Sequence, residues 1–166
     1  LGAPRLKRNN NFIDVIKHEL GHILGLGTLW VSKGITGTSE QNCPYTGQAA
    51  TKEWRDLSGC SVLPTELDGG SGTRCGHWDD STMKNELMTG YLIQGSNPNP
   101  FSRVTIAGML DLGYPKVNYN AAVRTIVATL LPDATGGVTS ETKLHPTARL
   151  HKKYCSLITI TTRKTT

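Results

Sequence analysis

The sequence predicts a single domain that is mostly helical and rich in loops. Two segments, at about 12–26 and 102–112, repeat apolar residues at helical spacing. The stretch between them is rich in Gly, Thr, Ser and Pro and shows little periodicity. At 166 residues the chain has the size of one domain and can bury a sizeable core. No run reaches the roughly 18 apolar residues that a transmembrane helix needs, so no such helix is expected.

The first predicted helix covers residues 12–26. Asn11 stands where a helix N-cap is expected, and glycines at positions 25 and 27 end the pattern. Gly25 lets the backbone turn away sharply from the helix. The apolar residues that repeat at helical spacing are Phe12, Ile13, Ile16, Leu20, Ile23 and Leu24.

A long ordered loop region is predicted for residues 31–76. Loops of this length inside a compact domain usually serve a function or are specially braced. The four cysteines form no C-x-x-C pair, which argues against a zinc ribbon and a thioredoxin-like site. They fit disulfides in an exported protein, for which three pairings are possible. We expect Cys43 to pair with Cys60, because both fall in this loop-rich stretch.

The second predicted helix begins after Ser102, which is a suitable N-cap, and ends at Gly113. Beyond Asn120 the sequence becomes threonine-rich and basic, and we expect irregular structure there. We therefore expect a domain over residues 1–122 and a basic, Thr-rich C-terminal tail over residues 123–166. The apolar residues of the second helix are Val104, Ala107, Met109, Leu110 and Leu112.

The net charge of +5 does not indicate nucleic-acid binding. Residues 1–140 carry 12 Lys+Arg and 12 Asp+Glu, which cancel, and residues 141–166 carry six basic residues against Glu141. A basic excess confined to a terminal segment is typical of a solvated tail. No aromatic-rich basic motif of an RNA-binding module accompanies it.

Residues 18–25 read HELGHILG, which contains a His-Glu-x-x-His motif. On a helix His18 and His22 project from one face and can hold one zinc ion, which we expect as the cofactor. Glu19 then lies beside the open position of the metal, where its carboxylate can take a proton from water and pass it to a leaving amine. A motif of this kind on a helix predicts metal-assisted hydrolysis of peptide bonds.

The third ligand is not found directly after Gly25, because Thr28 occupies the position where a histidine would follow. The remaining histidines are His77, His145 and His151, and the last two lie in the basic tail. His77 is followed eleven residues later by Met88, and a methionine turn beneath three histidines accompanies this motif in metzincins. A downstream glutamate, Glu40 or Glu53, is the alternative third ligand.

Three blocks of the sequence together resemble the leishmanolysin family of metzincin peptidases. They read HELGHILGLGTLW, GGSGTRCGHWDDSTMKNELMTGYL and NPFSRVTIAGMLDLGYPKVNYNAA, in that order, within residues 12–122. In that family an insertion separates the glycine from the third histidine. The resemblance implies that His18, His22 and His77 bind zinc, that Glu19 is the general base, and that Met88 forms the Met-turn.

The resemblance also implies an α+β fold, that of a metzincin-like zincin. Members of the family carry a twisted sheet before the active-site helix, and its edge strand binds the peptide substrate. Only about a dozen residues precede the helix here, so we expect mostly the helical and loop-rich lower sub-domain, with the N-terminal sheet largely missing. Tyr91 lies three residues after Met88, whereas the tyrosine ligand of other metzincins lies two residues after, so Tyr91 is not assigned a role.

The function predicted from the sequence is that of a zinc-dependent metalloendopeptidase acting on proteins or peptides. By resemblance the protein is expected to be extracellular or at the cell surface, and some members of the family are linked to adhesion. The alternative is a non-catalytic, zinc-binding or adhesion-related remnant of such a peptidase. A peptide substrate that binds as an added strand needs a sheet edge, and the sheet that would supply this edge is expected to be largely missing.

Overall fold

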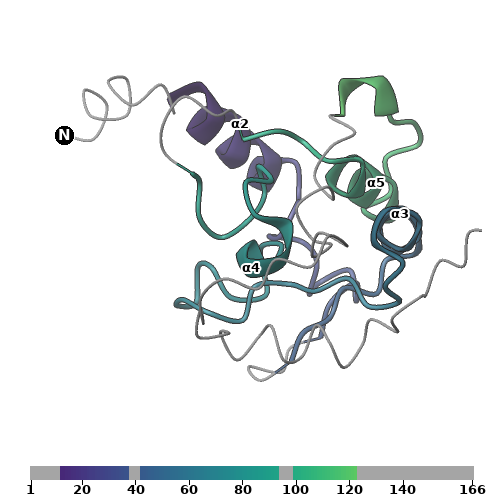
Figure 1. Ribbon diagram of the computed structural model, residues 1–166, viewed down its shortest axis with the longest axis horizontal. Helices are drawn as coiled ribbons and strands as arrows, with labels where there is room; N and C mark the ends of the chain where they lie inside the picture. The colour runs from purple at the N-terminus through teal and green to yellow at the C-terminus, as the bar shows by residue number, and fades with distance from the viewer. Residues whose placement is uncertain (1–11, 38–41, 94–98, 123–166) are drawn as a thin grey trace, which may run out of the picture.

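The computed structural model describes residues 12–37, 42–93 and 99–122. Helices and loops dominate these ranges (Figure 1), and backbone pairing within them is limited to isolated β-bridges. The mostly helical and loop-rich character is therefore confirmed, whereas the metzincin-like fold stays a prediction. The helices are α2 (Phe12–Ile23), α3 (Gln48–Ser58), α4 (Asp80–Met83) and α5 (Arg103–Asp111), followed by the 3-10 helix η1 (Tyr119–Ala121).

Helix α2 confirms the first predicted helix, although it ends at Ile23, earlier than expected. The chain then continues in turns, and Gly25 adopts a φ of 105°, which is the left-handed conformation that the predicted sharp turn requires. The buried carboxylate of Asp14 holds the start of the helix, because it accepts hydrogen bonds from the backbone and side-chain amides of Asn99, both at 3.0 Å. The expected cap at Asn11 lies outside the described residues.

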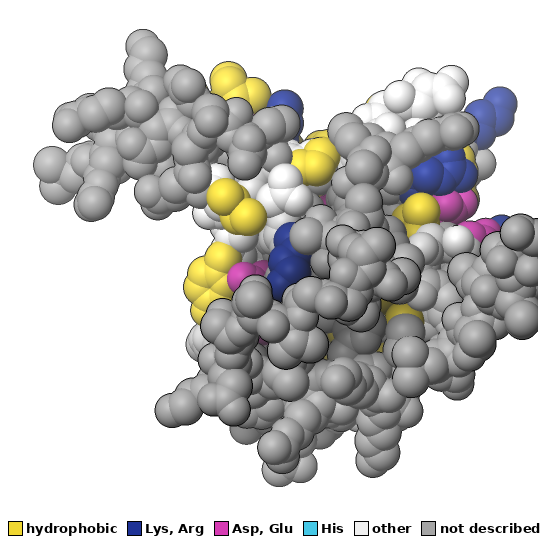
Figure 2. All heavy atoms as spheres, viewed as in Figure 1, with side chains coloured by type: hydrophobic (Ala, Val, Ile, Leu, Met, Phe, Trp, Pro, Cys, Tyr) yellow, Lys and Arg dark blue, Asp and Glu magenta, His cyan; other side chains and the backbone are white. Residues whose placement is uncertain are grey.

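The apolar stripe of α2 faces away from the core. Asp14, His18 and Gly21 form the buried side of the helix. The residues that indicated the helix from the sequence are 39–77% exposed, and apolar side chains reach the surface where α2 lies (Figure 2). These residues, which we call the α2 apolar face, are Phe12, Ile13, Ile16, Leu20, Ile23 and Leu24.

Helix α3 corrects the expectation that residues 31–76 are all loop. It begins after Gly47, whose backbone is extended, and ends at Gly59, whose φ is 73°. Its N-terminus is capped from a distance, because the carboxylate of Asp111 accepts the amide hydrogens of Ala49 at 2.8 Å and Ala50 at 2.9 Å. A helix whose cap lies about 60 residues away leaves no capping signal in its own sequence.

Helix α5 confirms the second predicted helix and its cap. The Ser102 hydroxyl accepts the amide hydrogen of Thr105, as a serine N-cap should. Helices α3 and α5 pack against each other (Figure 1). Arg103 on α5 also makes two hydrogen bonds to the carboxylate of Glu53 on α3, at 2.8 and 3.1 Å.

Three aromatic rings form the centre of the core. The ring centroids of Trp30, Tyr45 and Trp78 lie 4.5–5.0 Å apart, in tilted and edge-to-face arrangements that favour aromatic pairs. Around them lie buried side chains from the turns after α2, from α3, from α4 and from α5. The segment that contains Trp78 is thus anchored in the core.

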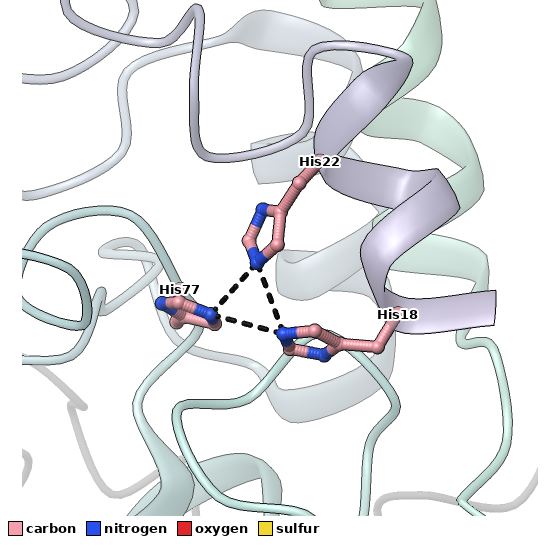
Figure 3. A group of neighbouring side chains, drawn as sticks. All are labelled: His18, His22 and His77. Atoms are coloured by element: carbon pink, nitrogen blue, oxygen red, sulfur yellow. Dashed lines mark hydrogen bonds between the residues drawn. The ribbon is translucent and has the colours of Figure 1, made fainter. Parts of the chain in front are cut away.

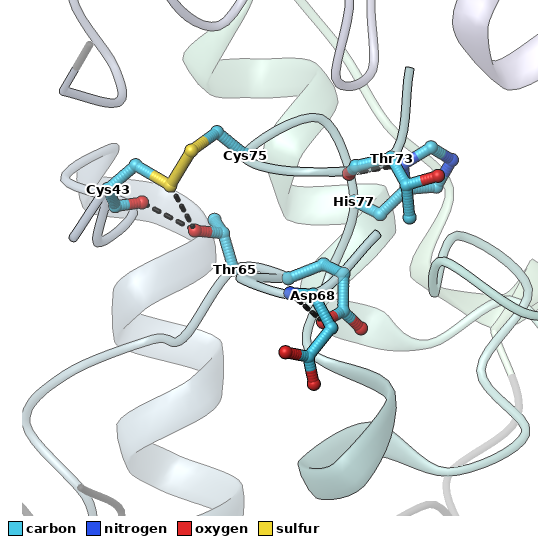
Figure 4. Close-up of a disulfide and its surroundings, with 7 residues drawn as sticks. Cys43, Thr65, Asp68, Thr73, Cys75 and His77 are labelled. Atoms are coloured by element: carbon cyan, nitrogen blue, oxygen red, sulfur yellow. Dashed lines mark hydrogen bonds between the residues drawn. A yellow bond between two sulfur atoms is a disulfide. The ribbon is translucent and has the colours of Figure 1, made fainter. Parts of the chain in front are cut away.

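The expected disulfide between Cys43 and Cys60 is wrong, because Cys43 pairs with Cys75 (Figure 4). The chain folds back between these cysteines, so that Thr65 forms an antiparallel bridge with Trp78 while its hydroxyl donates to the Cys43 carbonyl at 2.5 Å. Cys75 donates its amide hydrogen to Glu66 at 2.8 Å. This return of the backbone, which sequence distance alone does not reveal, brings Cys75 beside Cys43.

The predicted tail at 123–166, with His145 and His151, lies outside the described residues, and the proposed boundary at 122 stays a prediction. None of the helices in the described ranges is long and apolar enough to cross a membrane.

Candidate metal centre

His18, His22 and His77 converge on one point (Figure 3). The first two project from neighbouring turns of α2, and the third arrives from the loop before α4. The ring centroid of His77 lies 5.1 Å from that of His18 and 4.7 Å from that of His22. The structure therefore brings together the three histidines that the sequence singled out.

The backbone determines which nitrogen of each ring carries the proton. Each Nδ1 lies within hydrogen-bond distance of a carbonyl oxygen: His18 of Leu87 at 2.7 Å, His22 of Leu26 at 2.8 Å, and His77 of Thr73 at 2.9 Å. A carbonyl oxygen only accepts, so each Nδ1 carries a hydrogen and each Nε2 of the neutral ring is left with a lone pair. Metal-binding histidines are commonly oriented in this way.

The three Nε2 atoms point at one another, as the dashed lines of Figure 3 show. They are separated by 3.0 Å between His22 and His18, 3.0 Å between His22 and His77, and 3.2 Å between His77 and His18. Three lone pairs this close repel unless a cation lies between them. Two nitrogens bound to tetrahedral zinc at about 2.0–2.1 Å are about 3.3 Å apart. The donor set and its spacing therefore fit zinc.

The surroundings of His77 and His18 favour the neutral form of these two imidazoles. The pKa of His77 is lowered to about 4, chiefly by burial and also by the charges of His22 and His18, whereas the hydrogen bond to the Thr73 carbonyl acts in the opposite direction. Burial also lowers the pKa of His18, with the bond to Leu87 again opposing the shift. Neutral rings at physiological pH are the form that binds a metal ion.

The position of His77 depends on close packing between two loops. The turns after α2 pass so near the preceding residue, Gly76, that a Cβ atom at Gly27 would overlap the Gly76 carbonyl oxygen. On the other side of His77, Trp78 is fully buried and donates its amide hydrogen to the Met88 carbonyl at 3.0 Å. Trp78 and the turn at Met88 therefore hold the segment that carries His77 in place.

Met88 lies directly beneath α2 and is almost fully buried. A Cβ atom at Gly21 would lie 2.6 Å from the Met88 sulfur, so the helix and the turn come together only because Gly21 has no side chain. Leu87, the preceding residue, supplies the carbonyl that orients His18. Met88 thus occupies the place expected of a Met-turn residue, and its role as such remains a proposal.

The other candidate residues lie elsewhere or outside the described chain. Glu19 is exposed on α2, one residue after His18. Glu53, the alternative third ligand, is paired with Arg103 on α5, and Glu40 lies outside the described residues. Tyr91, which was assigned no role, is 52% exposed.

Sequence reasoning did not identify the groups that orient the histidines. The carbonyls of Leu26, Thr73 and Leu87 act through the backbone, so their side chains carry no signal. The buried carboxylate of Glu86, described below, was also missed. In the sequence, the only sign of its burial is that it directly precedes two apolar residues, Leu87 and Met88.

Comparisons with known proteins agree with the geometry. The leishmanolysin family matches residues 5–131. A leishmanolysin homolog from Crithidia fasciculata is 28% identical over 121 residues, which is 66% of this chain and 18% of the relative. Leishmanolysin-like peptidases of Drosophila melanogaster and Drosophila pseudoobscura pseudoobscura are each 42% identical over 57 residues, which is 34% of this chain and 8% of each relative.

The chain therefore spans less than a fifth of the length of these curated relatives. No solved structure matches it. The family match nevertheless covers most of the chain, and it includes all three converging histidines. The chain belongs to the leishmanolysin family.

Proposed function

We propose that this chain is part of a zinc-dependent metalloendopeptidase that hydrolyses peptide bonds in proteins. The observation that supports this most directly is the convergence of three imidazole Nε2 atoms, each left with its lone pair by an Nδ1 hydrogen bond to a carbonyl. Membership of a peptidase family supports peptide-bond hydrolysis as the class of reaction.

The chain's own residues divide the work between binding and proton transfer. His18, His22 and His77 would hold zinc, whose Lewis acidity makes a water molecule more acidic and polarises a peptide carbonyl. Glu19, exposed beside His18, would accept the proton from the attacking water and deliver it to the leaving amine. Met88, packed against Gly21, would support the helix from below.

Proteins or peptides are the proposed substrates, and an extracellular or surface location is the proposed setting. The Cys43–Cys75 disulfide supports that location, because such bonds persist in oxidising compartments.

Two measurements on the purified chain test this proposal. His77→Ala should lower zinc affinity more than about 100-fold, since a catalytic zinc site normally has three protein ligands. His145→Ala and His151→Ala serve as matched controls and should bind zinc as the wild type does. Unchanged zinc binding by His77→Ala would remove the third ligand from the proposal.

Glu19→Ala separates the chemistry from the binding of the metal. The variant keeps all three histidines, so it should retain zinc while chelator-sensitive cleavage of casein falls to background. Glu19→Asp should also cleave poorly, because the shorter side chain withdraws the carboxylate. Cleavage at the wild-type rate by zinc-loaded Glu19→Ala would assign the proton transfer to another group.

A second candidate is zinc binding without cleavage. The observation that favours it is the exposure of Glu19, the proposed proton acceptor, to solvent on α2. An active site works best when water is excluded around the reacting groups. A wild-type chain that binds zinc stoichiometrically and leaves casein intact would support this candidate over the peptidase.

A further inference from the structure

Glu86 is a buried carboxylate that the proposed chemistry does not use. Its exposed fraction is 0%, and it directly precedes Leu87, whose carbonyl orients His18. Burial raises the pKa of the Glu86 carboxyl, and hydrogen bonds from Thr105, Ser102 and Met88 oppose that rise. Burying a carboxylate costs free energy unless hydrogen-bond donors surround it. The donors around Glu86 therefore identify the segments that its carboxylate holds in place.

Four donors converge on the two Glu86 oxygens. The Met88 amide donates to Oε2 at 2.5 Å. The amide and the hydroxyl of Ser102 both donate to Oε1 at 2.9 Å, and the Thr105 hydroxyl donates to the same oxygen. One oxygen therefore holds the Met88 turn, and the other holds the N-terminus of α5.

The same carboxylate is connected to the segment that carries His77. The indole of Trp78, the next residue, donates to the Thr105 hydroxyl at 2.7 Å, and that hydroxyl donates to Glu86. The Trp78 backbone also pairs with the turn, through its bond to the Met88 carbonyl and its parallel bridge to Thr89. The network thus connects the turn that contains Leu87, which orients His18, with Trp78, which follows His77 in the chain.

We propose that Glu86 is a positioning residue for the metal centre. Its carboxylate fixes the turn whose Leu87 carbonyl orients His18 and, through Thr105, fixes the Trp78 segment that presents His77. The inference rests on the proposed zinc site. Glutamine cannot take this place, because both oxygens accept backbone amide hydrogens, and the amide nitrogen would set a donor against a donor.

Zinc affinity, measured by competition with a chromophoric chelator, tests the proposal. Glu86→Gln should bind zinc about 10- to 100-fold more weakly, as expected when a ligand loses its orienting partner. The matched control is Asp111→Asn, since Asp111 also accepts two backbone amides at a helix N-terminus, away from the histidines. It should keep wild-type affinity. Equal losses in both variants, or none in Glu86→Gln, would overturn the proposal.

Thr105 provides a second test that does not depend on Glu86→Gln folding. Thr105→Val has nearly the same shape but lacks the hydroxyl between Trp78 and Glu86, whereas Thr105→Ser keeps it. Thr105→Val should bind zinc more weakly than the wild type, and Thr105→Ser should bind zinc with wild-type affinity. Equal affinities in the two variants would contradict the link from Glu86 to the His77 segment.

The tautomer of His18 gives a readout that needs no metal. Nitrogen-15 NMR of the metal-free chain should show the Nδ1–H form in the wild type and in Asp111→Asn, and a mixture of tautomers in Glu86→Gln. An unchanged tautomer in Glu86→Gln would overturn the positioning role. A wild type that binds no zinc would instead refute the proposed function, and the NMR comparison would still decide the role of Glu86.

Discussion

Gly27 illustrates how single residues control the metal centre from outside it. Its φ is 77°, and a Cβ atom would overlap the backbone of Gly76, next to His77. We expect Gly27→Ala to lower zinc affinity, because the added methyl group pushes the His77 segment away from α2. Chelator competition at a temperature where the variant is folded measures the effect.

Gly34 offers the matched control for that substitution. It has a similar φ of 67°, but nothing lies within 4 Å of the place where its Cβ would be. Both alanine variants should lose about 1 kcal/mol of unfolding free energy from the left-handed backbone. Only Gly27→Ala should bind zinc more weakly, and equal zinc affinities in the two variants would contradict the steric argument.

The lowered pKa of His77 predicts how acid affects the metal-free chain. The unfolded chain takes up a proton at the usual pKa of 6.5, whereas folded His77 does so only near 4. Unfolding should therefore become easier as the pH falls from 6.5 to 4, by up to about 3 kcal/mol. Urea unfolding in the presence of a chelator measures this. His77→Gln should flatten the dependence, and the same slope in that variant would refute the assignment.

The Cys43–Cys75 disulfide acts at the scale of elements, because it ties the loop before α3 to the segment that ends in His77. Replacing both cysteines by serine should cost about 3–4 kcal/mol of unfolding free energy, from the 32-residue separation that the bond closes. It should also weaken zinc binding on the order of 10-fold, as Cys75 lies two residues before His77. Thermal unfolding and chelator competition measure the two effects.

Comparing the loss of stability with the loss of zinc affinity shows whether the disulfide positions His77 or only stabilises the domain. If the double serine variant is less stable but binds zinc like the wild type under conditions where it is folded, the disulfide stabilises the domain without positioning His77.

Elements with local signals were predictable, and those that depend on distant partners were not. Helices α2 and α5 carry their own periodicity, and Ser102 caps α5 as expected. Helix α3 was missed because its cap, Asp111, comes from the far end of α5. The cysteine pairing was wrong because it depends on how residues 65–78 fold back, which no local pattern encodes.

The candidate site divides in the same way. The spacing of His18 and His22 places both rings on one helix face, which is a purely local property. The approach of His77 followed from a motif and not from spacing, and the structure places it within contact of the other two. The orienting carbonyls and Glu86 could not be predicted, because their roles depend on tertiary contacts.

At the scale of the whole molecule, the α2 apolar face is an exposed hydrophobic surface among the described residues. Ile13 and Ile23 are 57% and 77% exposed. Apolar side chains exposed together on one helix face bind hydrophobic dyes and promote association. We expect the isolated chain to enhance the fluorescence of ANS, and Ile13→Lys with Ile23→Lys to reduce that signal while zinc binding is retained, since exposed substitutions rarely disturb a fold.

Lysines at exposed polar positions away from α2, Gln48→Lys with Asn120→Lys, add the same charge and should leave the dye signal unchanged. If the ANS fluorescence falls equally in both double variants, the added charge explains the decrease, and the α2 apolar face is not the surface that binds the dye.

The three carbonyls that orient the histidines have a consequence for how the protein tolerates mutation. Because Leu26, Thr73 and Leu87 act through main-chain oxygens, a change of side chain does not by itself delete these contacts. In a saturation library selected for metal retention, deleterious changes should therefore cluster at glycines in close contact and at buried anchors. Exposed polar neighbours of the histidines should vary freely, which gives the centre a genetic robustness that a shell of side-chain carboxylates would lack.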